Sequence, residues 1–251
     1  MFDPPAARNV IQPQAYAMAA ADAEAAGASW VISLDPALRL RLAGGEAAAL
    51  ETWKGLLGAV SFFREHRAWR SYQPLGVVGV LSDYSGGNFD MSGEILNLMT
   101  RLGTPLRVFW KDAAVQESFT GLKAVVYADG EPLQPELRKK ILAFVQNGGL
   151  LITGPGGGSE GKPLASAAHA RFQVRAYGKG RVAVAKAEPG DPYEFSQDAQ
   201  ILLSHANDLV RFFATGSSVC YHYTGSADQK KALLQLLTFA GGRGVTDLTV
   251  W

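Results

Sequence analysis

Cysteine is almost absent from this sequence, since Cys220 is the only one among 251 residues. A single cysteine excludes a disulfide within the chain and a zinc site built on several cysteines. The four histidines show neither HxxxH nor HxH spacing, so we expect no metal site. No motif in the sequence indicates a cofactor.

Long apolar runs and one-sided charge are also lacking. No apolar run reaches the roughly 18 residues that a membrane span requires. The first residues, MFDPPAARNVIQPQ, lack the basic region and apolar core of a signal peptide, so we expect a cytoplasmic location by default. The net charge is +1, and no basic run is interleaved with aromatic residues, which argues against a nucleic-acid partner. Apolar residues make up 47% of the chain, enough for one large domain or for a domain with a smaller piece.

The N-terminal part predicts an α-β-α segment. Residues 14–27 are rich in alanine and predict a helix that ends at Gly27, and 46–68 predict a long amphipathic helix. Between them, SWVISLD (29–35) predicts one strand. One strand cannot form a sheet, so it pairs with another domain or ends a larger sheet or barrel. RSYQPLG (70–76) is the expected boundary, giving domains 1–70 and 75–251.

Strands and helices alternate regularly after this boundary. Apolar strands are expected at 76–82, 106–110, 123–128 and 149–153, with amphipathic helices between them, as at 90–103 and 134–148. This alternation is typical of a parallel sheet that helices cover on both faces. It predicts an α/β fold with three layers and a doubly wound, mainly parallel sheet.

The last part of the chain predicts a mixture of elements. GPGGGSEGKP is expected to be a flexible loop, and YGKG joins two alternating strands into a hairpin over 171–186. A helix over 191–214 has Asp191 as its N-cap and Pro192 at its first position. A strand is expected at 217–225, a helix capped by Ser226 at 226–240, and a final strand at 246–251.

Two stretches carry a family resemblance: GVLSDYSGGNFDMSGEILNLM, and LKAVVYADGEPLQPELRKKILAFVQNGGLLIT. They resemble the class I glutamine-amidotransferase-like domains, above all the version attached to glycoside hydrolases, such as the trimerisation domain of family 42 β-galactosidases. The resemblance covers about 75–251 and implies a flavodoxin-like sheet. It also implies that 14–69 are the last helix, strand and helix of a (β/α)8 barrel. The implied partners are a second copy of the chain, a missing barrel domain, or carbohydrate.

The chemistry of an active amidotransferase is not evident in these residues. Such an enzyme needs a strand followed by G-x-C-x-G, with a downstream His and Glu. Here the strand GLLIT is followed by GPGGGSEG, in which Ser159 is a weak candidate nucleophile. Cys220 and His222 lie two apart on a predicted strand and so share a face. The structural interpretation, a small buried cysteine, is favoured over a catalytic pair.

The loop SDYSGGNFD remains as a candidate ligand site, because strand ends bind ligands in open α/β sheets. Asp83, Ser85 and Asn88 could bind a ligand there, with Asp83 as a weak catalytic candidate. The alternative interpretation is helix capping and turn formation.

We therefore expect a catalytically silent amidotransferase-like domain of a carbohydrate-active protein that acts in domain packing or oligomerisation. The alternative is a hydrolase or a small-ligand binding module that uses the loop at 83–90.

Overall fold

The computed structural model describes residues 13–158, 160–206, 212–214, 219–228, 230–238 and 248–250. They belong to two compact units, and each is described by itself. One unit includes 13–73 and 219–238, and the other includes 74–206 with 212–214 and 248–250. The sequence predicted a second domain that runs to 251, whereas 219–238 group with the N-terminal unit.

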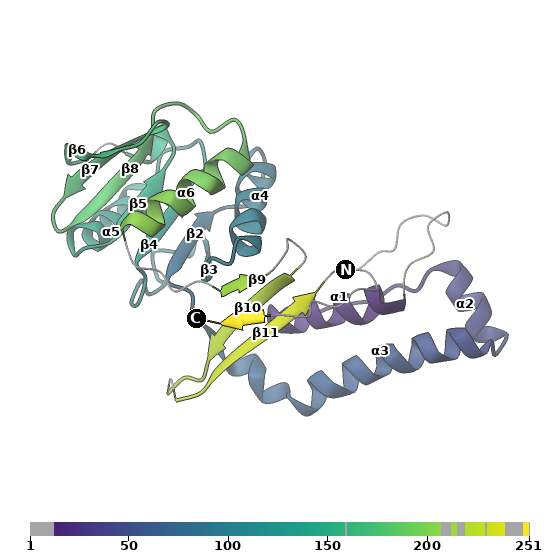
Figure 1. Ribbon diagram of the computed structural model, residues 1–251. Helices are drawn as coiled ribbons and strands as arrows, with labels where there is room; N and C mark the ends of the chain where they lie inside the picture. The colour runs from purple at the N-terminus through teal and green to yellow at the C-terminus, as the bar shows by residue number, and fades with distance from the viewer. Residues whose placement is uncertain are drawn as a thin grey trace. The chain divides into compact units, whose positions relative to one another are not determined.

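A seven-stranded sheet forms the centre of the larger unit, in the order β3-β2-β4-β5-β8-β7-β6 (Figure 1). Its strands are β2 (Val78–Ser82), β3 (Leu106–Trp110), β4 (Ala124–Tyr127), β5 (Leu150–Thr153), β6 (Lys162–Ala168), β7 (Phe172–Tyr177) and β8 (Gly180–Ala185). The first five strands in this order are parallel, and β7 and β6 continue the sheet in antiparallel pairing. The four strands expected after the boundary are confirmed, and they lie in one mainly parallel sheet.

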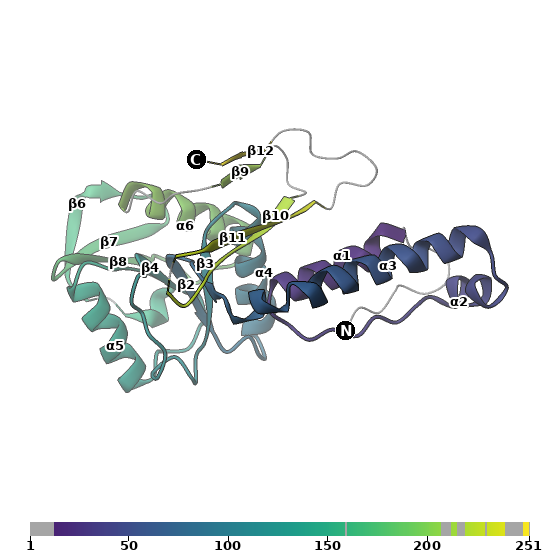
Figure 2. The ribbon, with the colours of Figure 1, turned by 90° about the horizontal axis from the view of Figure 1, so that it is seen from below.

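Helices cover both faces of this sheet, as the continuous apolar strands require. The helices are α4 (Asn88–Arg101), α5 (Pro135–Gln146) and α6 (Pro192–Ala206). Side chains of α4 and α6 pack on one face, in a cluster with Val80, Val126 and Ile152. Side chains of α5 pack on the other face, with Leu151 and Val182. Figure 2 shows the sheet between α5 and α6, so the three-layer expectation is confirmed.

The connection from β3 to β4 contains turns and no helix over 111–123, all of which the structure describes. Lys140 of α5 holds this segment in place. Its ammonium donates to the carbonyl oxygens of Ala114 and Val115, each at 2.7 Å, and also to that of Glu117. Ala114 and Leu122 add to the same core as α5, so the turns take the place of a covering helix.

The segment that follows β5 differs in part from its expectation. The loop after β5 begins with a short 3-10 helix, η2 (Pro155–Gly157), and continues into β6, a strand that the sequence did not predict. The β7–β8 hairpin is confirmed. Asp191 caps α6 as expected, since its Oδ1 accepts from the backbone N–H of Tyr193 at 2.8 Å. The predicted extent of this helix, to residue 214, is wrong.

The helix α6 ends at Ala206, and β9 (Phe212–Ala214) pairs antiparallel with β12 (Leu248–Val250). The final strand predicted at 246–251 is therefore confirmed over 248–250. The apolar run near residue 212 suits a strand as well as a helix, which is the usual ambiguity of short apolar segments.

Three helices build the N-terminal part of the smaller unit: α1 (Pro13–Ala25), α2 (Pro36–Ala43) and α3 (Ala47–Glu65). α1 and α3 lie side by side (Figures 1 and 2), and Tyr16, Ala20 and Leu56 lie in their shared core. None of the described helices is long and apolar enough to span a membrane.

The strand expected at 29–35 is wrong, and so is the α-β-α description of this segment. Only Ile32 makes an isolated bridge, and Asp35 is the N-cap of α2. Trp30, Ile32 and Leu34 alternate as in a strand, but they pack against the helices rather than into a sheet. Asp35 is fixed by Tyr16, whose hydroxyl donates to Oδ2 at 2.5 Å, and its Oδ1 caps α2 at Leu38.

A sheet completes the smaller unit, and its first strand follows the 3-10 helix η1 (Arg67–Ser71). Its order is β1-β10-β11, with β1 (Gln73–Pro74), β10 (Val219–Gly225) and β11 (Ala232–Thr238). The strand expected at 217–225 is confirmed as β10, but the helix predicted at 226–240 is wrong, because β11 pairs antiparallel with β10. Alanine, leucine and glutamine favour a helix in isolation, and the pairing overrides that preference. Ser226 closes the hairpin, accepting from the N–H of Lys231 at 3.0 Å.

Candidate functional site

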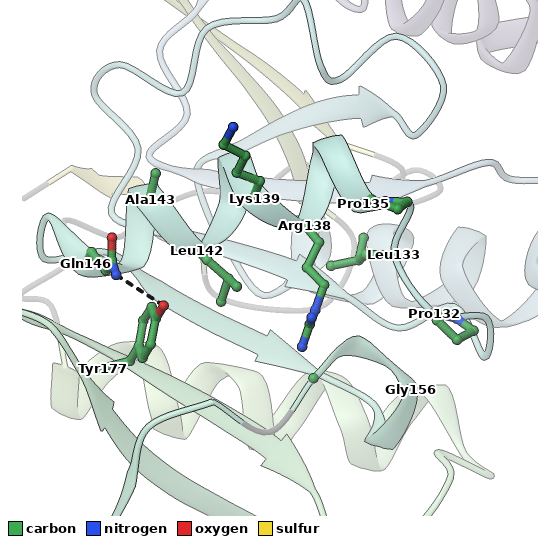
Figure 3. A pocket seen from close by; sticks show the side chains of 11 residues that line it. Pro132, Leu133, Pro135, Arg138, Lys139, Leu142, Ala143, Gln146, Gly156 and Tyr177 are labelled. Atoms are coloured by element: carbon green, nitrogen blue, oxygen red, sulfur yellow. Dashed lines mark hydrogen bonds between the residues drawn. The ribbon is translucent and has the colours of Figure 1, made fainter.

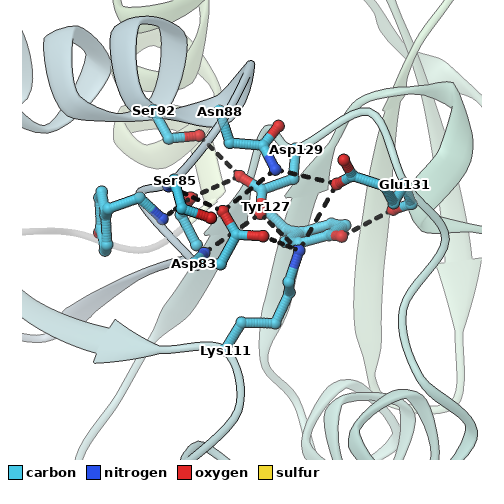
Figure 4. A network of polar contacts seen from close by, with 10 residues as sticks. Asp83, Ser85, Asn88, Ser92, Lys111, Tyr127, Asp129 and Glu131 are labelled. Atoms are coloured by element: carbon cyan, nitrogen blue, oxygen red, sulfur yellow. Dashed lines mark hydrogen bonds and ion pairs between the residues drawn. The ribbon is translucent and has the colours of Figure 1, made fainter.

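The candidate site lies where the chain changes direction in the sheet. From β2 the chain passes to β3 on one side, and then to β4 on the other side of β2. In open α/β sheets, ligands bind beyond the carboxyl ends of the strands at such a point. Asp83 follows β2, Lys111 follows β3, and Asp129 and Glu131 follow β4. Figure 4 shows their side chains pointing toward one another.

One ammonium group joins the three carboxylates. Lys111 Nζ lies 2.9 Å from Asp83 Oδ2 and 3.0 Å from Asp129 Oδ2. It lies 3.5 Å from Glu131 Oε2, at the rim of the site. The Lys111 side chain is only 11% exposed, so its charge depends on these partners rather than on water.

Asp129 is the buried centre of the network, and its side chain is inaccessible to solvent. Its Oδ1 accepts from the hydroxyls of Ser82 at 2.6 Å and Ser92 at 2.8 Å. Its Oδ2 accepts from Lys111 and from the backbone N–H of Asp83 at 3.3 Å. With four donors around it, this carboxylate holds the ends of β2, β3 and β4 and the start of α4 together.

The three ligand candidates of the sequence, Asp83, Ser85 and Asn88, do come together here. Asp83 Oδ1 accepts from the backbone N–H of Ser85 at 3.0 Å and from Asn88 Nδ2 at 3.2 Å. Asn88 Nδ2 also donates to Glu131 Oε2 at 2.9 Å. Asn88 therefore links the loop after β2 to the loop after β4, beyond its place at the start of α4.

The surroundings fix the protonation of these groups. The hydrogen bond from Lys111 lowers the pKa of Asp83 to about 2. Burial alone would lower the pKa of Lys111, but its hydrogen bonds to Asp83 and Asp129 raise it above the usual value. Burial raises the pKa of Tyr127, beside Lys111, to about 12. At neutral pH, Lys111 keeps its proton and Asp83 does not gain one, so neither is suited to proton transfer.

The acidic groups could in principle hold a cation. Single oxygens of Asp83, Asp129 and Glu131 all lie within 4.8 Å of one another. The ammonium of Lys111 contacts the same three carboxylates. A hard divalent cation prefers such oxygen ligands, but Lys111 already supplies the positive charge that it would bring.

Backbone strain marks the loop after β2. Among the described residues other than glycine, Tyr84 has the one positive φ, at 47°. Its backbone N–H donates to Ser82 Oγ at 2.9 Å, and its ring lies 6.1 Å from that of Trp110. Burial raises the pKa of the Tyr84 hydroxyl, which donates to the carbonyl oxygen of Val80 at 3.2 Å.

The other candidates of the sequence are not brought into this network. Ser159 lies outside the described residues. Cys220 and His222 lie on β10, in the smaller unit, and their side chains are not among those described. The described residues that directly follow β5, 154–158, contain only glycine and proline, so they offer no nucleophile there.

Sequence reasoning missed Lys111, Asp129 and Glu131. A signal for Asp129 was present, because AVVYAD ends in an acid after an apolar strand, as GVLSD does. The switch-point rule then places the ends of β2 and β4 together. Lys111 gave no such signal, since a lysine after an edge strand usually faces solvent.

No family model matches the chain, and no curated protein gives a significant match. Solved structures do resemble it. An α-L-fucosidase isoenzyme 2 from Paenibacillus thiaminolyticus aligns over 96% of this chain and 49% of its own, with a TM-score of 0.57 and 13% identity. A β-galactosidase from Bacillus circulans sp. alkalophilus covers 69% of this chain and 37% of its own, with a TM-score of 0.50 and 10% identity. A catalytic mutant of a GH42 β-galactosidase from G. stearothermophilus covers 72% and 37%, with a TM-score of 0.50 and 12% identity.

At these identities the likeness establishes a shared fold. The chain spans less than half the length of each of these three solved structures. The α/β fold of this chain therefore also occurs within glycoside hydrolases.

Proposed function

We propose that the larger unit is a catalytically silent, class I amidotransferase-like domain of a carbohydrate-active protein, and that it acts in domain packing or oligomerisation. The observation that carries this proposal is the position of Lys111. Its ammonium lies between carboxylates at the ends of β2 and β4, at the point where folds of this kind bind their ligands. Ion pairs within the chain at this point join the strand ends and engage the charged groups that a substrate would otherwise contact.

The loop after β5 supports the silent role. In a catalytically active enzyme of this fold, a nucleophile would lie in a strained turn at the end of this strand. Here Thr153 ends the strand, and its hydroxyl is completely buried. The glycines and proline of 154–158 follow it and supply no reactive group.

The strand order supports the amidotransferase-like and flavodoxin-like description. Numbered along the chain, the five parallel strands β2, β3, β4, β5 and β8 lie in the order 2-1-3-4-5. This is the flavodoxin-like order of doubly wound sheets. The glycoside hydrolases that share the fold support the carbohydrate-active context by analogy.

We expect the chain to show no turnover of glutamine or of nitrophenyl glycosides. The reason is chemical: Lys111 and Asp83 keep fixed protonation states, and the loop after β5 carries no described nucleophile. Initial rates are measured with purified chain at high concentration. Turnover that is lost in Asp83→Ala or Cys220→Ala, while Lys123→Ala retains it, would contradict the silent role.

Self-association is tested through the N-terminal helices. Several large apolar side chains of α3 are at least 38% exposed: Leu50, Trp53, Leu57 and Phe62. Full burial of one such side chain stabilises by roughly 1.5–3 kcal/mol. Association with a second surface that covers these side chains would therefore be favourable. Deleting residues 1–70 is expected to change the oligomeric state, obtained from the mass measured by light scattering, and to lower the melting temperature. A truncated chain that keeps both its oligomeric state and its melting temperature would contradict the oligomerisation role.

One observation favours the alternative, a hydrolase or small-ligand binding module that uses 83–90. The strained φ of Tyr84 is the kind of outlier that concentrates at functional sites. The carboxylates of Asp83 and Glu131 remain 24% and 62% exposed, so a ligand could reach them. The same turnover assays separate the hydrolase from the silent role.

A further inference from the structure

The two edges of the seven-stranded sheet are protected to different degrees. At one edge, β6 begins with Lys162 and Pro163, and its register with β7 shifts between Pro163 and Ala168. A lysine, a proline and a bulge in an edge strand all hinder its pairing with another chain. The opposite edge is β3, whose residues LRVFW contain no proline and pair with β2 in an unbroken register. The sheet is therefore blunted at β6 and open to a further strand at β3.

The β6 end of the sheet is also held by contacts within the chain. Gln146 Nε2 of α5 donates to the hydroxyl of Tyr177 on β7 at 3.1 Å, as the dashed line in Figure 3 shows. Arg175 of β7 donates to the carbonyl oxygens of Glu160 and Gly161 at 3.2 and 2.8 Å, which fixes the segment that enters β6. Of the strands that the structure describes, none pairs with the outer side of β3.

Alternate residues of β3 direct their backbone groups to this outer side. The N–H of Lys111, directly after the strand, donates to the last residue of β2 at 2.9 Å. Backbone groups of successive residues in a strand point to opposite sides, so those of Leu106, Val108 and Trp110 point away from β2. The carbonyl oxygen of Trp110 accepts from the N–H of Ala113 at 3.1 Å. An added antiparallel strand would supply partners for the remaining N–H and C=O groups.

The side chains of β3 leave this edge apolar. Leu106 packs against the core on the α4 side of the sheet, and Val108 and Trp110 share its face but are 56% and 52% exposed. Arg107 lies on the opposite face. Its guanidinium donates to two carbonyl oxygens of the 111–123 segment, at 2.9 and 3.2 Å. Its charge is therefore held within the chain and does not guard the edge.

We infer that β3 pairs antiparallel with β3 of a second copy of this chain, with Val108 on the two-fold axis. This register sets Leu106 opposite Trp110 and Arg107 opposite Phe109, so all five residues of each strand have a partner. A two-fold axis requires a surface of this self-complementary kind. Each Arg107 then faces an aromatic ring, as it does within its own chain, where the guanidinium lies 5.0 Å from the centre of the Phe109 ring.

Charge selects this register over its neighbours. An axis at Arg107 would set two guanidinium groups opposite each other, and an axis at Phe109 would set Arg107 opposite Lys111. Like charges directly opposite destabilise an antiparallel pair. Because the outer side of β3 complements itself in one position, a second copy is the occupant that it fits. The inference rests on the oligomerisation role proposed above, and it assigns that role to β3 of the larger unit.

The test is the weight-average mass of the full chain, measured by sedimentation from about 1 μM to about 1 mM. Wild type is expected to dimerise reversibly with a Kd of about 10–100 μM, since a pair of five-residue strands is a small interface. Val108→Lys and Val108→Glu should each weaken association about tenfold or more, because like charges then meet on the axis. An equimolar mixture of these two chains should recover the association, because opposite charges then meet there.

Ile201→Lys is the matched control, since Ile201 is an apolar side chain of α6 that is 47% exposed, and it should associate like wild type. Circular dichroism checks that each variant is folded. A wild-type chain that stays monomeric throughout, or a mixture that associates no more than its components, would overturn the inference. Association that survives Val108→Lys but is lost on deletion of residues 1–70 would also overturn it, while the oligomerisation role would stand on the N-terminal helices.

A cysteine on the axis tests the register. In a Cys220→Ser background, Val108→Cys is expected to form a disulfide between two copies under mild oxidation. Residues that face each other in a hydrogen-bonded pair have Cα atoms about 5.5 Å apart, which suits a disulfide. Trp110→Cys is the control, because Trp110 is similarly exposed but lies opposite Leu106 and away from its own copy. Equal cross-linking of the two variants, or none in Val108→Cys, would contradict the pairing.

Discussion

Replacing Lys111 by methionine is expected to lower the free energy of unfolding by about 3–5 kcal/mol. The side chain is 11% exposed and touches three carboxylates, one of them completely buried. Removing the ammonium leaves the Asp129 carboxylate without its charge partner, and burial of an unpaired charge is costly. Urea unfolding of wild type and variant measures the difference, provided that both curves have the same slope.

Lys123→Met is the control for this substitution, because Lys123 is exposed and precedes β4 in the same sheet. It should change stability by less than about 0.5 kcal/mol. Adding Asp83→Asn and Glu131→Gln to Lys111→Met should recover part of the loss, since both changes reduce the repulsion among the remaining carboxylates. A loss below about 1 kcal/mol for Lys111→Met would mean that water screens the network.

The same network predicts a dependence of stability on acid. The pKa of Asp83 is about 2 in the folded chain, below its ordinary unfolded value of about 3.9. A depressed carboxyl pKa contributes stability that is fully present above the unfolded value and is lost as the pH falls through the folded value. The contribution is on the order of 2 kcal/mol and disappears between about pH 4 and pH 2. As the pH falls through this window, the free energy of unfolding should decrease more steeply for wild type than for Asp83→Asn.

Gly180→Ala is expected to destabilise the chain by about 3 kcal/mol, at the upper end of what overpacking costs. A Cβ at Gly180 would lie 2.2 Å from the carbonyl oxygens of both Gly149 and Val145. These are backbone atoms of the last turn of α5 and of the segment that joins α5 to β5, so the clash cannot be relieved by rotating a side chain. The β7–β8 hairpin would have to move away from α5, and thermal unfolding followed by circular dichroism would report the loss.

Gly190→Ala is the matched control, since a Cβ there meets no atom within 4 Å. It should leave the melting temperature nearly unchanged. Because Tyr177 belongs to the same hairpin, Gly180→Ala should also disturb the hydrogen bond between Tyr177 and Gln146. If Gly180→Ala melts like wild type, the close approach of the hairpin to α5 is not rigid.

The core of the larger unit could be predicted because its local and global signals agree. Continuous apolar strands such as GVVGVLS and LKAVVY, separated by amphipathic helices, fit few arrangements other than a covered parallel sheet. The predictions failed where one composition suits two structures. ALLQLLT is a good helix by propensity, and only its partner strand β10 makes it a strand.

For a similar reason, only part of the candidate site could be predicted from the sequence. Asp83, Ser85 and Asn88 are close in sequence, so a loop after a strand was enough to group them. Lys111 and Asp129 join them through strand order, which the sequence does not state. Burial decides the rest, because a lysine that faces solvent and one that holds three carboxylates look the same in a sequence.

The β7–β8 hairpin has a consequence for the order in which the chain folds. Tyr177 pairs with Gly180, so only Gly178 and Lys179 separate the two strands, and a hairpin this local forms in about 1–10 μs. The parallel pairs β2–β4 and β5–β8 instead join residues far apart along the chain, and closing such loops is slower. The fifth parallel strand therefore reaches the sheet already paired with its neighbour β7. Amide protection in β7 and β8 should appear before the parallel half of the sheet is complete, and the rate-limiting step should belong to the parallel strands.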